Sequence, residues 1–169
     1  MLQMIEVPAR LGLALLQIQA AEHVIRLVLQ HVIQDKSITV EILEAQEQAE
    51  RKKTLGYFLH KLRARADLVP ELDEMLQKFL DYRNTFAHNL SEVPGWNLET
   101  DEGRQVAIAW LAELQQLTEQ VCKIFWGLVR AWEKEHDNAH PIAGEGEFFK
   151  DIDPIYTTLA TMLFRAKPD

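Results

Sequence analysis

One short segment of this 169-residue chain combines side chains that could do chemistry: Arg83, Asn84 and His88. A guanidinium binds anions such as phosphate through a planar fork of donors, and histidine side chains ordinarily exchange protons near neutral pH. Asn84 and His88 are four residues apart, so they would be neighbours on one face of a helix. The amide could orient the imidazole or contact a substrate.

Arg83 falls on the apolar face of the helix predicted for this segment. At about 100° per residue, it lies in the middle of the stripe that includes Leu72 and Phe79. A charged guanidinium at a core-facing position is costly without a partner. Two interpretations stay open. Arg83 pairs with an acid across a helical bundle, for which Glu22 or Asp81 could serve, or it faces a shared cleft where an anion binds.

His88 lies about 140° further round the same helix, so one straight helix does not bring Arg83 and His88 to one point. Two copies of the helix that face each other across a two-fold axis would form a composite site, with an arginine and a histidine from each copy. A lone histidine near a helix C-terminus also has a structural interpretation, because the helix dipole favours a cation there.

The elements that would position these residues are all helices. Apolar residues recur at three- and four-residue spacing along most of the chain, and no strand-like alternation persists. The pattern predicts helices at residues 10–34, 55–65, 70–88, from 101 through at least 132, and 153–165. We expect an all-α fold: a four-helix bundle over residues 1–137, followed by residues 138–169 as a linker and a short C-terminal helix packed on the same domain or on a partner protomer.

Three residues mark predicted helix starts. Thr54 and Thr100 can cap helices through their hydroxyl groups. Pro70 suits a first helical position, because proline has no amide donor to lose there.

The charge of the chain is acidic overall but unevenly placed. The formal net charge is −8, which argues against a non-specific nucleic-acid coat protein. Residues 51–65 nevertheless carry six cations and no acid, and we name these six the basic strip: Arg51, Lys52, Lys53, Lys61, Arg63 and Arg65. The strip is either a solvated helix face or a surface that contacts the backbone of RNA.

Composition also bears on compartment and cofactors. The single cysteine, Cys122, cannot form an internal disulfide, which favours a reducing compartment. Glu22, His23 and Arg26 interrupt the most apolar stretch, and the N-terminus lacks the charge pattern of a signal peptide, so we expect a cytoplasmic protein without a membrane span. No histidine pair has an acid at metal-ligand spacing and no glycine-rich phosphate loop is present, so we expect neither a metal nor a cofactor.

The sequence RNTFAH at residues 83–88 resembles the Arg-x4-6-His motif of the HEPN superfamily, in its Arg-Asn-x-x-x-His form. The resemblance extends over about residues 10–136. It includes a long apolar first helix that contains Ala21 and Glu22, a second helix that starts with the sequence KTLG at residues 53–56, and a long amphipathic last helix.

This resemblance implies a helical bundle that dimerises with its two motifs facing each other. Many members of the superfamily are metal-independent endoribonucleases of toxin–antitoxin or phage-defence systems. By analogy, His88 would act as general acid and base, Arg83 would bind the scissile phosphate, and Asn84 would position one of them. The implied partners are an RNA substrate, a second copy of the chain, and a cognate antitoxin or regulatory protein.

The superfamily also contains members that bind a protein or a nucleotide without cleaving RNA. A non-catalytic HEPN-like binding module, such as an adaptor or an antitoxin, is therefore the alternative interpretation.

Overall fold

The structure is a computed structural model that describes residues 2–33, 49, 53–136 and 154–166. Within these residues the chain forms five α-helices, one π-helical turn, one 3-10 turn and two three-residue strands. Their order is α1 (Leu2–Leu27), η1 (Val28–Val32), α3 (Leu55–Arg65), β1 (Ala66–Leu68), α4 (Pro70–His88), η2 (Leu90–Glu92), α5 (Asp101–Glu135), α7 (Pro154–Leu163) and β2 (Phe164–Ala166). The predicted all-α fold class is confirmed. Residues 138–153 of the predicted linker lie outside the described residues.

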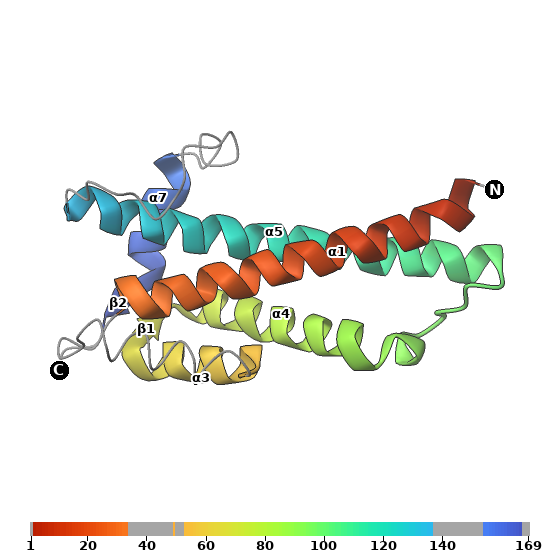
Figure 1. Ribbon diagram of the computed structural model, residues 1–169, viewed down its shortest axis with the longest axis horizontal. Helices are drawn as coiled ribbons and strands as arrows, with labels where there is room; N and C mark the ends of the chain where they lie inside the picture. Colours follow the sequence, from red (N-terminus) through yellow and green to blue (C-terminus); the bar gives the residue numbers. More distant parts are fainter. Residues whose placement is uncertain (1, 34–48, 50–52, 137–153, 167–169) are drawn as a thin grey trace.

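Two long helices define the long axis of the molecule (Figure 1). α1 and α5 lie side by side and run in the same direction, while α4 runs beside them in the opposite direction. The 35 residues of α5 span about 52 Å. α3 lies beside the first half of α4, and α7 crosses α5 near its C-terminal end.

The core follows from the apolar stripes that the sequence predicts. α5 contributes a fully buried residue about once per turn, and α1 and α4 face it with stripes of their own. The core residues with almost no exposed surface include Val24, Ile25, Val28, Leu72, Leu76, Phe79, Ala107, Leu111, Leu114, Val121 and Phe125. Since these residues come from α1 with its adjoining turn η1, from α4 and from α5, the core fixes how the three helices lie against one another.

All three predicted helix starts are confirmed. The Thr100 hydroxyl accepts a hydrogen bond from the Gly103 amide at 3.1 Å and caps α5, and Pro70 opens α4. The predicted side-chain cap at Thr54 is wrong, although α3 does begin directly after it. The first turn of α3 is instead closed by the Thr54 carbonyl, which accepts from the Tyr57 amide at 3.1 Å.

α1 begins earlier than predicted, at Leu2 rather than residue 10, and Pro8 lies inside it. The neighbouring Val7 is buried in the core, and this burial offsets part of the cost of the hydrogen bond that proline cannot donate. At its other end the helix widens into the π-helical turn η1.

α1 also bears on the prediction that no segment spans a membrane. Ile5–Val32 is long and apolar enough to cross a membrane by length and composition, with a mean hydropathy of 1.3, and 33% of its most apolar window is buried. The core helix of a soluble protein meets the same criterion, so this finding does not separate the two. The absence of a span stays a prediction.

The two short strands contradict the expectation of a chain without strands. β1 and β2 pair antiparallel, with Ala66 opposite Ala166, Asp67 opposite Arg165 and Leu68 opposite Phe164. The last helix therefore ends at Leu163, and the prediction that it runs to residue 165 is wrong. Three residues are too few to show alternation, and the partners lie about a hundred positions apart in sequence, so the pairing depends on tertiary contacts.

Gly127 marks the point where α7 crosses α5. A Cβ atom placed there would lie 2.5 Å from the backbone carbonyl oxygen of Tyr156, which is closer than two such atoms can approach. The crossing therefore requires a glycine at this position of α5.

We predict that Gly127→Ala lowers the melting temperature, because the added methyl group forces α7 away from α5 at a cost of about 1–3 kcal/mol. Gly56→Ala is the matched control, since its nearest contact would be an ordinary 3.8 Å from Thr54. Thermal unfolding followed by circular dichroism measures both variants. Equal melting temperatures for the two would contradict the close crossing.

Candidate functional site

Arg83 is held by an ion pair between two helices. Its Nε donates to Oε1 of Glu22 on α1 at 2.8 Å. The Arg83 side chain is 23% exposed and the Glu22 side chain 17% exposed, so the pair lies at the edge of the core. The predicted pairing of Arg83 with an acid across the bundle is confirmed, with Glu22 as the partner. Asp81, the other candidate, accepts instead from Gln77 on its own helix.

Asn84 contacts Arg83 rather than His88. Its Oδ1 accepts from Nη1 of Arg83 at 3.4 Å, which is near the outer limit for a hydrogen bond, and its side chain is exposed. The amide therefore lies beside the guanidinium, at a place from which it could orient that group.

His88 is the last residue of α4 and its side chain is exposed. Among the described residues, no hydrogen bond or ion pair joins His88 to Arg83 or to Asn84. This separation agrees with the helical geometry, which turns the imidazole about 140° away from the guanidinium. A site that uses both groups on one phosphate therefore needs a second set of residues.

An aromatic cluster lies behind this segment. Tyr82 stacks on Trp110 of α5 with ring centroids 5.1 Å apart, and Trp96 meets Trp110 edge-on at 6.1 Å. The Tyr82 hydroxyl donates to Glu113 at 2.5 Å, and this bond, helped by burial, raises the pKa of Tyr82 to about 12. The cluster holds α4, α5 and the intervening loop together. Local sequence patterns do not predict the contact between Tyr82 and Glu113, because the two residues are 31 positions apart.

Two arginines of the basic strip make contacts within the chain. Arg63 donates to Asp73 at 2.6 Å and to Gln77 at 3.2 Å, which fastens α3 to α4. Arg65 donates to the carbonyls of Leu29 and Ile33 at 3.2 and 3.3 Å, which fastens the end of α3 to the end of the first helical segment.

Two lysines of the strip lie over one aromatic ring. The Nζ atoms of Lys53 and Lys61 are 5.3 and 5.2 Å from the centroid of Tyr57. Arg51 and Lys52 lie outside the described residues. A role of the basic strip in RNA binding stays a prediction for all six residues.

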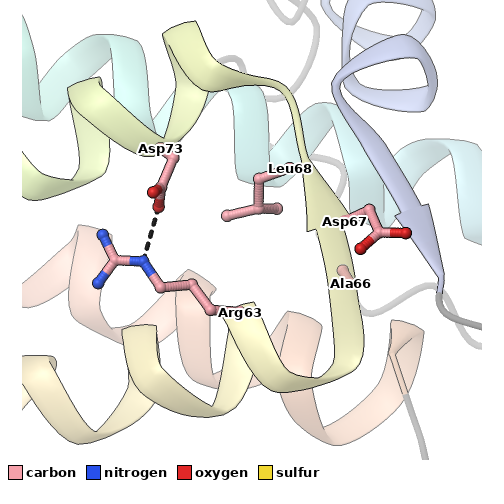
Figure 2. A pocket seen from close by; sticks show the side chains of 5 residues that line it. All are labelled: Arg63, Ala66, Asp67, Leu68 and Asp73. Carbon is pink, nitrogen blue, oxygen red and sulfur yellow. Dashed lines mark hydrogen bonds and ion pairs between the residues drawn. The ribbon is translucent and has the colours of Figure 1, made fainter.

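A shallow pocket of about 180 Å³ opens where α3, β1 and α4 meet, and Figure 2 shows the five residues that line it: Arg63, Ala66, Asp67, Leu68 and Asp73. Arg63 and Asp73 are joined across it (Figure 2). Because the carboxylate of Asp73 already neutralises the guanidinium of Arg63, the pocket offers little net charge to bind an anion. It also contains none of the predicted catalytic residues.

Among the described residues, neither the cysteine thiol nor a cluster of possible metal ligands forms a second reactive site. Cys122 is buried, and burial raises the pKa of its thiol to about 12, so it remains protonated at neutral pH. Cys122 is a small residue of the core. Among the described residues, no group of three or more His, Cys, Asp or Glu side chains is placed to hold a metal ion.

Comparison with known proteins does not place the chain in a family. No protein-family model matches it, and neither a curated protein nor a solved structure matches it. A functional assignment therefore depends on the chemistry and geometry of its own residues.

We predict a favourable coupling between Glu22 and Arg83 in a double-mutant cycle of Glu22→Ala, Arg83→Ala and the double variant. Because both side chains are mostly shielded from water, the coupling free energy should be about 1–2 kcal/mol, above that of a typical exposed pair. Urea unfolding of the four proteins measures it. Additive losses in the two single variants would show that the ion pair does not stabilise the fold.

Proposed function

We propose that this chain is a HEPN-like, metal-independent endoribonuclease that works as a cytoplasmic homodimer in a bacterial toxin–antitoxin or phage-defence system. The observation that carries the proposal is the arrangement of the motif. Glu22 orients Arg83 at the edge of the core, Asn84 lies beside it, and the exposed His88 ends the same helix.

Arg83 is suited to bind the scissile phosphate. The Nε of Arg83 donates to Glu22, and its Nη1 makes a long contact with Asn84. Its Nη2 has no partner in the part of the chain that the structure describes. A guanidinium fixed on one side presents its remaining donors in a defined direction, and phosphate oxygens match their spacing. The same donors would stabilise the extra negative charge of the transition state.

His88 is suited to move protons, since its imidazole is exposed at the end of α4. As a general base it would take the proton of the ribose 2′-hydroxyl, whose oxygen then bonds to phosphorus. The bond from phosphorus to the 5′-oxygen breaks, and that oxygen takes a proton from a second imidazole. The products are a 2′,3′-cyclic phosphate and a 5′-hydroxyl. In a homodimer, the second imidazole is His88 of the other copy.

One observation favours the alternative of a non-catalytic HEPN-like binding module, such as an adaptor or an antitoxin. The Glu22 carboxylate already neutralises Arg83 in the free protein, which lowers the affinity of the guanidinium for phosphate. A module of this kind would keep the ion pair for stability and recognise a protein or a nucleotide elsewhere.

We predict that the purified protein cleaves total cellular RNA in excess EDTA and leaves 2′,3′-cyclic phosphate ends. His88→Ala should lower the rate at least about 100-fold, because it removes the general acid and base. Arg83→Ala should lower it by a similar factor, because phosphate and transition-state binding are both weakened. Gel electrophoresis and end-group analysis of the fragments measure both effects.

His60→Ala is the matched control for this assay, since His60 is also an exposed histidine but lies on α3. It should cleave like the wild type. Equal activity in all four proteins would identify a contaminating nuclease. If none of the four proteins cleaves RNA, and His88→Ala does not change the toxicity of the protein in cells, the binding module would be favoured.

We predict that Lys53→Ala combined with Lys61→Ala weakens binding of single-stranded RNA, measured in a His88→Ala background so that the RNA stays intact. The slope of log affinity against log salt should become shallower by about 0.7 for each phosphate group that the protein no longer neutralises. Lys134→Ala, an exposed lysine near the far end of α5, is the control. An unchanged slope in the double variant would show that Lys53 and Lys61 do not contact the RNA backbone.

A further inference from the structure

One face of α1 exposes apolar side chains to solvent. Ile5 is 69% exposed, Leu13 50% and Leu16 65%. Small residues lie between them on the same face, and all six fall within an arc of about 100° around the helix. We name this set the α1 stripe: Ile5, Ala9, Gly12, Leu13, Leu16 and Ala20.

The opposite face of α1 is already used by the core. Ala14, Ile18 and Ala21 are buried there against the rest of the bundle. α1 is therefore apolar on two sides, and a helix of this kind is expected to be covered on both. Three large apolar side chains left in water on one helix face need an explanation beyond the fold of a single chain.

The order of large and small residues fits a second copy of the same helix. Consider an antiparallel pair of α1 helices with the two-fold axis between Gly12 and Leu13. The numbers of two residues that face each other across the axis then add up to 25. Ile5 then faces Ala20, Ala9 faces Leu16, and Gly12 faces Leu13, so every large side chain of the stripe meets a small one. A two-fold interface requires this self-complementarity, and alternation of large and small residues lets two helices interdigitate.

We propose that the α1 stripe is the interface between two copies of this chain, with their α1 helices antiparallel and the two-fold axis between Gly12 and Leu13.

Charge argues against a lipid surface as the occupant. Helices that lie on membranes usually carry Lys and Arg beside their apolar face, where these residues contact anionic lipids. The two arginines of α1 are instead engaged within the chain. Arg10 bonds to Glu6 and to Gln115 of α5, while Arg26 donates to a carbonyl of its own helix and lies over the ring of Phe58. The chain as a whole is acidic, with a net charge of −8.

The pairing also connects the interface to the candidate site. Leu15, which is half-exposed, lies between the α1 stripe and Glu22 on the flank of α1 that faces Arg83. Glu22 is about 14 Å from the axis along the helix. From Arg83, α4 runs antiparallel to α1 (Figure 1), so its last five residues carry His88 about 7.5 Å back toward the axis. In each copy His88 then lies nearer to the axis than Arg83 does. This last step rests on the proposed function, whereas the pairing of the two helices does not.

The first test is the mass of the protein in solution at tens of micromolar, by sedimentation velocity. The wild type should sediment as a species of twice 19.5 kDa. Leu16→Glu should sediment as a monomer, because it places a carboxylate against Ala9 of the other copy. Met162→Glu is the control: Met162 is 70% exposed but lies on α7, so this variant should remain a dimer. A monomeric wild type, or a Leu16→Glu variant that remains dimeric, overturns the proposal.

The second test examines the register of the pair and does not depend on how well a charged variant folds. Ala9→Cys with Leu16→Cys should form covalent dimers under mild oxidation, because these positions face each other across the axis. Ala9→Cys with Ala20→Cys is the control, since Ala20 faces Ile5 and not Ala9; it should give few covalent dimers. The native Cys122 is buried in the fold, so it is shielded from cross-linking. Equal cross-linking of the two pairs, or none in the first, overturns the register.

Two further measurements separate this proposal from the proposed function. A wild type that is monomeric and co-sediments with vesicles of anionic phospholipid overturns the proposal in favour of a lipid surface. A Leu16→Glu monomer that still cleaves RNA supports the interface and shows that the catalytic site is complete in one chain. A Leu16→Glu monomer without activity supports both the interface and the composite site.

Discussion

The ion pair between Glu22 and Arg83 is the constraint on which the arrangement of the candidate site depends. Arg83 continues the stripe that buries Leu72, Leu76 and Phe79 one turn after another, so the core itself places a permanent charge against α1. Such a charge is tolerated at the edge of an apolar core when a partner satisfies it in good geometry. The Glu22 carboxylate satisfies it at 2.8 Å, and this bond joins α4 to α1 in the arrangement that the core produces.

Much of the fold is predictable from local patterns. The apolar spacing of α4 and α5, the proline that opens α4 and the Thr100 cap are properties of neighbouring residues, and the structure contains them as expected. The pairing of β1 with β2 was not predictable, because each strand has three residues and the partners meet only after α5 and α7 have packed. The π-helical turn and the continuation of α1 through Pro8 depend in the same way on burial, which the periodicity of a single helix does not contain.

The same distinction between local patterns and tertiary contacts applies to the residues of the candidate site. Helical spacing predicts that Arg83 is a charge within an apolar stripe. The cost of a buried charge then predicts an acidic partner, and Glu22 was one of the two acids expected to pair with it. The sequence did not distinguish the arginines of the basic strip from its lysines. Arg63 and Arg65 meet Asp73 and two carbonyl groups that come from other elements, and such contacts require the tertiary structure. The long fork of an arginine reaches these partners and can bond more than one, whereas Lys53 and Lys61 lie over Tyr57.

Two structural requirements act on α1, and its sequence reflects both of them. One side must bury small and branched residues against α5 while it also offers Glu22 to α4, and the other side presents large and small apolar residues in an order that is complementary to itself. A helix that served the core of one chain alone would gain solubility from polar residues at positions 5, 13 and 16, and none of these residues contributes to the buried core. The proposed composite site requires a second copy of the chain, because His88 and Arg83 of one helix point in different directions. The proposed pairing of two α1 helices about an axis between Gly12 and Leu13 would supply that copy without any change to the fold of the single chain.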